Sequence, residues 1–222
     1  MDPFTSTGTG VDIDAGDEVV CRLAVLASGR GSNLEAILEA CRREDVPARV
    51  VVVVTDREGA PAFERATRAG VDAVFLNPKD HADRAAYDAA LLTTLERYGA
   101  GLVCLAGFMR VLTPGFVRAW AGRLVNIHPS LLPAFSGLHA QRQALDHGVK
   151  LAGATVHFVD EGVDTGPIIV QASVPVRSDD TEESLSARIL AEEHRLYPEA
   201  IRLFAEGRLS ITGRRVIIKE NA

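Results

Sequence analysis

Short apolar runs alternate along the chain with longer amphipathic segments, beginning near residue 19. The apolar runs are typical of strands buried on both faces of a sheet, and they cover residues 19–27, 49–55, 73–76 and 102–106. The amphipathic segments repeat apolar residues at helical spacing, and they cover residues 32–41, 60–69 and 82–98. Gly70 and Gly99 follow the last two segments, as is typical at helix ends. We therefore expect an α/β fold: a doubly wound, mostly parallel sheet with helices on both faces.

The pattern changes beyond residue 124. Three strand-like runs follow, at residues 124–128, 153–158 and 168–176, with little helix between the last two. Parallel neighbours need a long crossover, so we expect an antiparallel C-terminal extension of the sheet. A long helix is expected over 181–204, with two glutamates in its first turn, where carboxylates complement the helix dipole. The run 209–218, interrupted by a Thr-Gly pair, predicts a terminal hairpin.

The first twenty residues differ in composition from the rest. They are rich in Gly, Thr and Asp, and they lack the basic start and apolar core of a signal peptide. We expect residues 1–20 to be a disordered arm or an expression remnant. Residues 21–222 are expected to form one domain, because no repeat, low-complexity linker or composition break interrupts them.

Charge and composition exclude several classes of protein. The chain carries 24 Lys and Arg against 30 Asp and Glu, a net charge of −6, and it has no basic stripe for nucleic acid. No apolar run approaches the roughly 20 residues of a membrane span. The three cysteines show no CxxC spacing, and an odd number of free thiols is typical of a reducing compartment. We expect a soluble, cytoplasmic protein without a metal centre.

Segment 27–33, with the sequence ASGRGSN, joins the first predicted strand to the first predicted helix. Glycines at such a turn let backbone N–H groups face an anion, and the helix dipole adds partial positive charge. A phosphate could therefore bind at Gly31, Ser32 and Asn33. The segment matches neither GxGxxG nor the P-loop pattern, and a plain turn in which Ser32 or Asn33 caps the helix explains the same residues. Both interpretations stay open at this point.

Asn126 and His128 lie two residues apart in the predicted strand 124–128, so they face the same side of the sheet. The strand ends before Pro129, and open α/β sheets build their sites at the carboxyl ends of strands. An amide can donate to a developing oxyanion, and an imidazole can transfer a proton near neutral pH. The pair therefore favours a catalytic site over a purely structural role.

Asp164 lies in an acidic loop that follows the predicted strand 153–158 and precedes a Gly-Pro turn. Such loops are ordinarily solvated turns. A carboxylate brought against His128 would instead raise the pKa of the imidazole and hold its ring. His157, on the strand itself, is expected to be a core or supporting histidine rather than a catalyst.

Four segments, in this order, resemble the phosphoribosylglycinamide formyltransferase family, the folate-dependent enzymes of purine synthesis. They are SGRGSN at 28–33, AGFMRVL at 106–112, NIHPSLLP at 126–133 and DTGP at 164–167. The resemblance extends from Arg22 to about Leu209. It implies a formyltransferase-like domain over 21–222 that transfers the formyl group of 10-formyltetrahydrofolate to the amino group of 5'-phosphoribosylglycinamide in de novo purine (IMP) biosynthesis.

The resemblance also implies roles for individual residues. The family's catalytic residues match Asn126, His128 and Asp164. The ribonucleotide is implied to bind its phosphate at Gly31, Ser32 and Asn33 and its amino end at Glu193. Folate binding is implied for the matching residues Arg84, Met109, Arg110, Val111, Leu112, Asn126, Asp160 and Asp164.

These roles agree with the chemistry of direct amine attack on a formyl group. Asn126 and protonated His128 can stabilise the oxygen that gains negative charge, and Asp164 can keep His128 charged and pass protons through water. No metal is needed. Both substrates are anions and the chain is net negative, so local donors must hold them. We expect a monomer or homodimer that acts on these two small molecules, without nucleic-acid or membrane partners.

One position departs from the family's usual pattern: Ser136 occupies a place where proline is common. Losing a proline frees the backbone of the loop without removing a polar group. We expect altered local rigidity and the same chemistry.

Three other functions are compatible with parts of the same sequence pattern. A methionyl-tRNA formyltransferase would carry a further C-terminal domain and a basic surface, and a formyltetrahydrofolate deformylase would carry an N-terminal regulatory domain, for which 20 residues are too few. A non-catalytic folate- or nucleotide-binding protein would not need Asn126, His128 and Asp164 together. Formyl transfer to the ribonucleotide is therefore the expectation, with the deformylase and the binding protein as alternatives.

Overall fold

The computed structural model describes residues 20–220, and within this range the chain forms a nine-stranded sheet with helices on both faces. The strands are β1 (Cys21–Ala27), β2 (Ala48–Thr55), β3 (Ala73–Phe75), β4 (Leu102–Leu105), β5 (Leu124–His128), β6 (Leu151–Phe158), β7 (Ile168–Pro175), β8 (Leu209–Thr212) and β9 (Arg215–Ile218). The helices are α1 (Ser32–Arg42), α2 (Pro61–Arg68), the 3₁₀ helix η1 (Pro78–Asp80), α3 (Arg84–Arg97), α4 (Pro114–Ala119), α5 (Ala140–Asp146) and α6 (Glu182–Ala205).

The sheet has the order β3-β2-β1-β4-β5-β6-β7-β9-β8. Strands β1 to β5 are mutually parallel, whereas β6 runs antiparallel to β5 and β7 antiparallel to β6. The hairpin of β8 and β9 extends the sheet beyond β7 through the single parallel pairing of Ile168 with Arg215. The predicted doubly wound sheet with an antiparallel C-terminal extension is confirmed.

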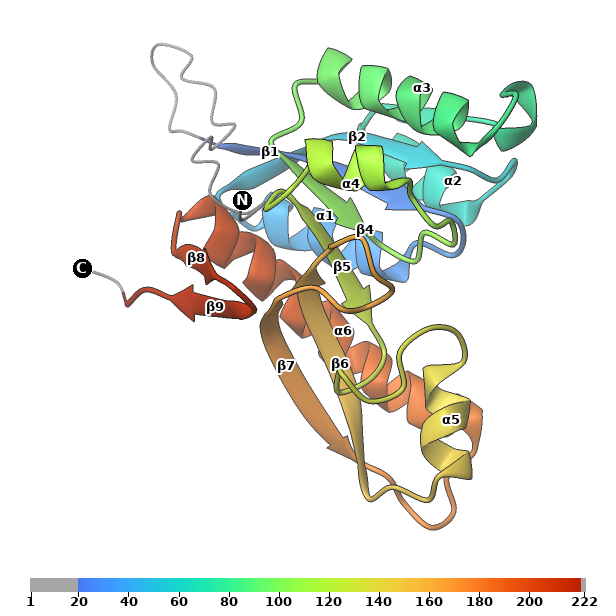
Figure 1. Ribbon diagram of the computed structural model, residues 1–222, viewed down its shortest axis with the longest axis vertical. Helices are drawn as coiled ribbons and strands as arrows, with labels where there is room; N and C mark the ends of the chain where they lie inside the picture. The colour runs from blue at the N-terminus through green and yellow to red at the C-terminus, as the bar shows by residue number, and fades with distance from the viewer. Residues whose placement is uncertain (1–19, 221–222) are drawn as a thin grey trace.

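Two hydrophobic layers cover the faces of the sheet. One layer packs α3 and α4 on one face, with Tyr87, Leu91 and Phe116 fully buried. The other layer packs α1, α2, α5 and α6 on the opposite face. Figure 1 shows α3 and α4 in green on one side of the sheet, and α1, α2 and α6 on the other. This burial of both faces explains why the parallel strands are apolar along their whole length.

Two short helices, α4 and α5, were not predicted. They have only six and seven residues, which is too short for a helical repeat of apolar positions to emerge from the sequence. Helix α3 begins two residues later than predicted, because the carboxylate of Asp83 accepts a hydrogen bond from the N–H of Ala86 (2.8 Å) and so caps the helix.

Helix α6 lies across one face of the sheet and packs mainly against β6, β7 and α1. Its start is fixed by a capping box, in which Thr181 and Ser184 each accept from the other's backbone N–H. Farther along, the Tyr197 hydroxyl lies 3.0 Å from the carbonyl oxygen of Leu105 and 3.2 Å from that of Val125. The fully buried Tyr197 therefore fixes the position of α6 relative to strands β4 and β5.

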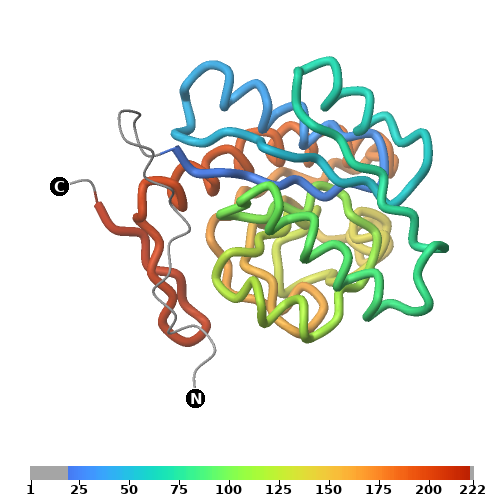
Figure 2. Tube along the Cα trace, turned by 90° about the horizontal axis from the view of Figure 1, so that it is seen from above, coloured from blue at the N-terminus to red at the C-terminus, as the bar shows by residue number. Residues whose placement is uncertain are grey.

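The predicted hairpin is present at the edge of the sheet, and Figure 2 shows it in red at one side of the molecule, beyond the end of α6. Within residues 20–220, no helix combines the length and the apolar character that crossing a membrane requires. The arm predicted over residues 1–20 lies, except for Val20, outside the described residues.

Candidate active site

The central cavity lies where the order of the parallel strands reverses, between β1 and β4. The connections leaving two such strands diverge to opposite faces and open a crevice at their carboxyl ends. Here the crevice is a cavity of about 740 Å³, lined by residues that follow β1, β2, β4 and β5 and by side chains of α5 and α6. The predicted residues Gly31, Ser32, Asn33, Met109 and Glu193 all line it.

The loop after β1 is held against the start of α2. Gly31 has a φ of 74°, and a Cβ atom there would lie 2.9 Å from the Cα of Ala62, so the position requires glycine. The N–H of Ala62 also donates to the carbonyl of Gly29 (3.2 Å). Gly31 is the N-cap of α1, and no side chain caps the helix, so the interpretation in which Ser32 or Asn33 caps it is wrong. The N–H groups of the first turn remain available to an anion.

Asn33 and Glu193 meet across the cavity. The Nδ2 of Asn33 donates to Oε2 of Glu193 (2.7 Å), and both residues are buried, with 8% and 7% of their surface exposed. Burial raises the pKa of Glu193, although the hydrogen bond from Asn33 opposes this rise. The Oδ1 of Asn33 is buried without a partner among the described residues. This wall of the cavity therefore offers oxygen acceptors to the donors of a ligand.

Four polar side chains converge beyond the end of β5. Asp164, in the loop after β6, places Oδ2 3.3 Å from Nδ1 of His128 and Oδ1 3.7 Å from Nε2 of His157. The Nδ2 of Asn126 lies 3.3 Å from the same His157 nitrogen. Nε2 of His128 donates to the carbonyl oxygen of Phe135 (2.9 Å), so the His128 ring is held at both nitrogens. The structure thus brings the three predicted catalytic residues together.

Asp164 is held by several donors. Its Oδ2 accepts from the N–H of Gly137 (2.8 Å), and only 12% of its side chain is exposed. Burial by itself raises the pKa of Asp164, but His157, the Gly137 N–H and the charge of His128 together outweigh it and leave the pKa below its ordinary value. The carboxylate is therefore ionised at neutral pH and is aimed at His128.

The loop that carries Asp164 is braced from within. Oδ1 of Asp160 accepts from the Thr165 hydroxyl (2.6 Å) and from the N–H of Gly162 (3.1 Å). A side chain at Gly166 would place Cβ 1.8 Å from the carbonyl oxygen of Phe158, so only glycine fits there. Asp160, which was predicted to bind folate, thus uses one oxygen to shape the loop.

Of the residues predicted to bind folate, Met109 lines the cavity, and Arg110, Val111 and Leu112 follow it in the loop after β4. The side chains of Met109 and Val111 are 59% and 62% exposed, whereas Leu112 is buried. The Arg110 guanidinium lies 4.6 Å from the centre of the Tyr87 ring, and its Nε is buried without a partner among the described residues. Arg84 is exposed at the start of α3, one turn before Tyr87. The loop after β4 thus combines two exposed apolar side chains with one buried guanidinium nitrogen that has no partner among the described residues.

Sequence reasoning missed several residues of the site. His157 was assigned a supporting place, but its proximity to Asp164 and Asn126 was not foreseen, because it depends on the antiparallel pairing of Asn126 with His157 in β5 and β6. Arg57 and Gln141 line the cavity and were not predicted either. No motif marks them, since they enter from a turn and from the short helix α5. Ser136 is exposed, and its effect on loop rigidity stays a prediction.

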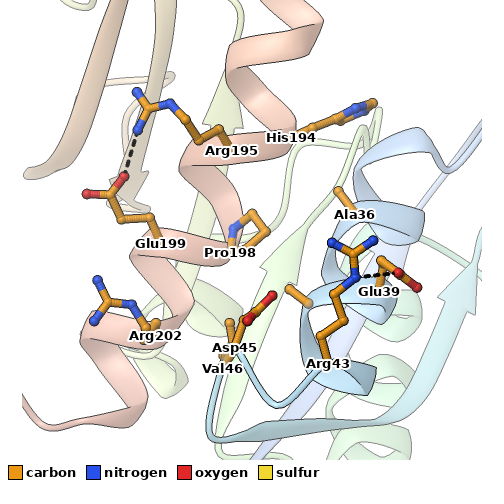
Figure 3. A pocket seen from close by; sticks show the side chains of 11 residues that line it. Ala36, Glu39, Arg43, Asp45, Val46, His194, Arg195, Pro198, Glu199 and Arg202 are labelled. Carbon is orange, nitrogen blue, oxygen red and sulfur yellow. Dashed lines mark hydrogen bonds and ion pairs between the residues drawn. The ribbon is translucent and has the colours of Figure 1, made fainter.

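A second pocket, of about 480 Å³, lies between α1 and α6 (Figure 3). Arginines of this pocket pair with neighbouring carboxylates: Arg43 with Glu39 (2.6 Å) and Arg195 with Glu199 (3.1 Å). His194 lines this pocket, whereas the adjacent Glu193 lines the central cavity. None of the residues predicted for the site lines the second pocket.

Cys21, Cys41 and Cys104 are free thiols, as predicted. In the part of the chain that the structure describes, no group of three His, Cys, Asp or Glu side chains has the arrangement of a metal site.

Comparison with known proteins gives the family. The formyl transferase family model matches residues 21–201. Trifunctional purine biosynthetic protein adenosine-3 of Drosophila melanogaster is 53% identical over 84% of this chain, and the chain spans only 14% of that protein's length. Phosphoribosylglycinamide formyltransferase of Escherichia coli (strain K12) is 46% identical over 85% of this chain and 89% of its own length.

Solved structures agree with these relatives. Glycinamide ribonucleotide transformylase 1 from Symbiobacterium toebii superposes with a TM-score of 0.90 at 58% identity, covering 93% of this chain and all of that one. A formyltetrahydrofolate deformylase from Pseudomonas syringae pv. tomato superposes with a TM-score of 0.84 at 26% identity, and the match covers 90% of this chain and 66% of that one. On the sequence match and the shared fold, the chain belongs to the formyl transferase family.

Proposed function

We propose that the protein transfers the formyl group of 10-formyltetrahydrofolate to the amino group of 5'-phosphoribosylglycinamide, a step of de novo purine synthesis. The observation that carries the proposal is the meeting of Asn126, His128 and Asp164 at the end of β5, next to a cavity that begins at the N-terminus of α1. Two relatives that this chain matches over nearly their whole length carry the names of this enzyme, and those names support the proposal.

The reaction joins the substrate amine to the formyl carbon and breaks the bond between that carbon and N10 of the folate. The carbonyl oxygen gains negative charge while the new bond forms, and the amine must lose a proton that N10 must gain. The Asn126 amide can donate to the charged oxygen, and the Nε2–H of His128 can do the same if it leaves its hydrogen bond to the Phe135 carbonyl, while Nδ1 stays beside Asp164. Asp164 can accept the amine proton through water and return it to the leaving nitrogen.

The two walls of the site suit the two substrates. The free N–H groups at Gly31, Ser32 and Asn33 suit a phosphate, and the acceptors of Asn33 and Glu193 suit donors of the same ribonucleotide. On the folate side, exposed Met109 and Val111 suit a flat apolar ring system, and the unsatisfied Nε of Arg110, together with Arg84, suits a carboxylate. Asn126, Leu112, Asp160 and Asp164 complete the proposed folate contacts.

The proposal extends to the organisation of the protein. Residues 21–222 form the formyltransferase domain, which acts in the cytoplasm as a monomer or homodimer on small-molecule substrates without a metal, a nucleic acid or a membrane. Size-exclusion chromatography with light scattering would distinguish the two assemblies.

A formyltetrahydrofolate deformylase is the main alternative, because it would use the same histidine and aspartate to direct water at the formyl carbon. It is the weaker one: the deformylase match has 26% identity, against 58% for the transformylase structure. A non-catalytic binding protein would have no use for the arrangement of Asn126, His128 and Asp164.

One experiment separates the three functions. The protein is incubated with 10-formyltetrahydrofolate, with and without the glycinamide ribonucleotide, and the loss of the formyl group is followed by absorbance. We expect loss only when the amine substrate is present, with formation of the formylated ribonucleotide. Equal loss without the amine would support the deformylase, and no loss at all would support the binding protein.

A further inference from the structure

Two arginines line the central cavity beside the loop after β1. Arg30 lies within the loop, between Gly29 and Gly31, and Arg57 lies in the turn that follows β2. Among the described residues, neither forms an ion pair with a carboxylate, whereas the neighbouring Arg65 pairs with Glu35. The side chains of Arg30 and Arg57 are both exposed. The cavity therefore has two guanidinium groups that no protein carboxylate neutralises.

The fold brings these arginines to the same place. In the parallel pairing of β1 with β2, Ala27 lies opposite Thr55, so the two strands end level with each other. Arg30 and Arg57 follow within three residues of those ends. Contacts with Ala62 then hold the loop on the start of α2, which is the helix that the Arg57 turn leads into.

Further observations at this place point to an anionic ligand with donors of its own. The first turn of α1 presents free N–H groups to the cavity, and these favour an anion. Asn33, with 92% of its surface buried, lines the same cavity, and its Oδ1 has no hydrogen-bond partner among the described residues, so a small shift of the side chain would let it accept from a ligand donor. Glu183 and Glu193, both on α6, also line the cavity and bring negative charge to it.

We propose that Arg30 and Arg57 bind the phosphate of the ribonucleotide and so make the site selective for the phosphorylated substrate. This inference rests on the proposed function and deepens it. A phosphate near pH 7 carries close to two negative charges, which two guanidinium groups match, and guanidinium–phosphate hydrogen bonds are strong and directional. The overall charge of −6 makes these local cations the more important for attracting a dianion.

The test uses the variants Arg57→Gln and Arg30→Gln, assayed with the glycinamide ribonucleotide and with its dephosphorylated nucleoside. Each variant should raise the KM for the ribonucleotide about tenfold, the effect of one charge-assisted hydrogen bond. The KM for the folate and the activity on the nucleoside should not change. Arg68→Gln is the matched control, because it removes the same charge from α2 at a position outside the cavity.

An equal loss on the nucleotide and the nucleoside would overturn the proposal, since the arginines would then act on something other than phosphate. A second measurement does not depend on catalysis. Inorganic phosphate should raise the melting temperature of the wild type and of Arg68→Gln, and it should fail to do so in the Arg30→Gln/Arg57→Gln double variant. If the wild type transfers no formyl group but phosphate still raises its melting temperature and not that of the double variant, the proposed function fails and the phosphate site stands. If phosphate raises the melting temperature of all the proteins equally, the phosphate site is wrong.

Discussion

The imidazole of His128 lies between two acceptors, the carboxylate of Asp164 and the carbonyl of Phe135. Replacing His128 with alanine removes the group proposed to stabilise the oxyanion and should lower kcat by a factor of about 10² to 10⁴. Steady-state kinetics measure the loss, and circular dichroism checks that the fold is intact. His147→Ala, at an exposed histidine after α5, is the control and should keep its activity. Near-normal turnover in His128→Ala would remove this residue from the mechanism.

Asp164 has a pKa below its ordinary value, and this shift gives a pH dependence with a definite sign. A lowered carboxyl pKa in the folded state contributes stability that is present above the unfolded pKa of 3.8 and is lost as the pH falls through the folded pKa. Asp164→Asn should lower kcat by orders of magnitude and lower the melting temperature at pH 6. Its deficit in melting temperature should shrink below about pH 4. Glu161→Gln, at an exposed carboxylate of the same loop, should show neither change.

The pKa of Glu193 is shifted in the opposite direction to that of Asp164. Burial raises its pKa, so ionisation in the folded state costs stability that becomes apparent as the pH rises above the ordinary value of 4.5. Glu193→Gln keeps an acceptor for Asn33 and removes the charge. We expect a higher melting temperature than the wild type at pH 7, no difference near pH 4, and a raised KM for the ribonucleotide. An unchanged KM together with higher stability would show that Glu193 does not contact the substrate.

At the scale of residues, periodicity alone predicted that Asn126 and His128 share a face, because side chains alternate along a strand. The contact of His128 with Asp164 could not be derived this way. It depends on the return of β6 beside β5 and on a loop whose shape is set by Asp160 and Gly166. Only the family resemblance linked these distant positions before the structure was known.

At the scale of elements, the junction of the β1 loop with α2 permits a matched pair of glycine substitutions. Gly31→Ala places a methyl group against the backbone of Ala62 at a φ of 74°, and it should destabilise the protein by about 1–3 kcal/mol and raise the KM for the ribonucleotide. At Gly29, a Cβ meets nothing within 4 Å, so Gly29→Ala should change stability much less. Chemical denaturation compares the two, and equal losses would contradict the role of the close contact.

The long elements were predictable because each repeats one pattern over many residues. The short ones were not: α4 shows only a start signal, in which the Thr113 hydroxyl accepts from the N–H of Phe116 (3.4 Å) with Pro114 in the first turn. That Thr-Pro pair is present in the sequence and could have indicated the helix. The N-cap of α5 is His139, which has a φ of 59°, and its side chain caps no N–H of the helix, so the start of α5 has no such signal.

At the scale of the whole molecule, the site draws on both ends of the described chain, because Asn33 and Glu193 are 160 residues apart. Sequence patterns predicted the layers of the fold, but they do not contain this distance information. The position of α6 brings Glu193 to Asn33, and the hydrogen bonds of Tyr197 to β4 and β5 fix that position.

This attachment of Tyr197 also sets an order of events during synthesis on the ribosome. The carbonyls of Leu105 and Val125 leave the ribosome long before Tyr197 does, and at about 5–20 residues per second the 72 residues from Val125 to Tyr197 take about 4–14 s. During this interval the nascent chain has Asn126 and His128, which are proposed to act in catalysis, but lacks the complete helix α6. The cavity proposed to bind the ribonucleotide is therefore completed late, so the proposed substrate can bind the finished protein but cannot be captured by a partly made one.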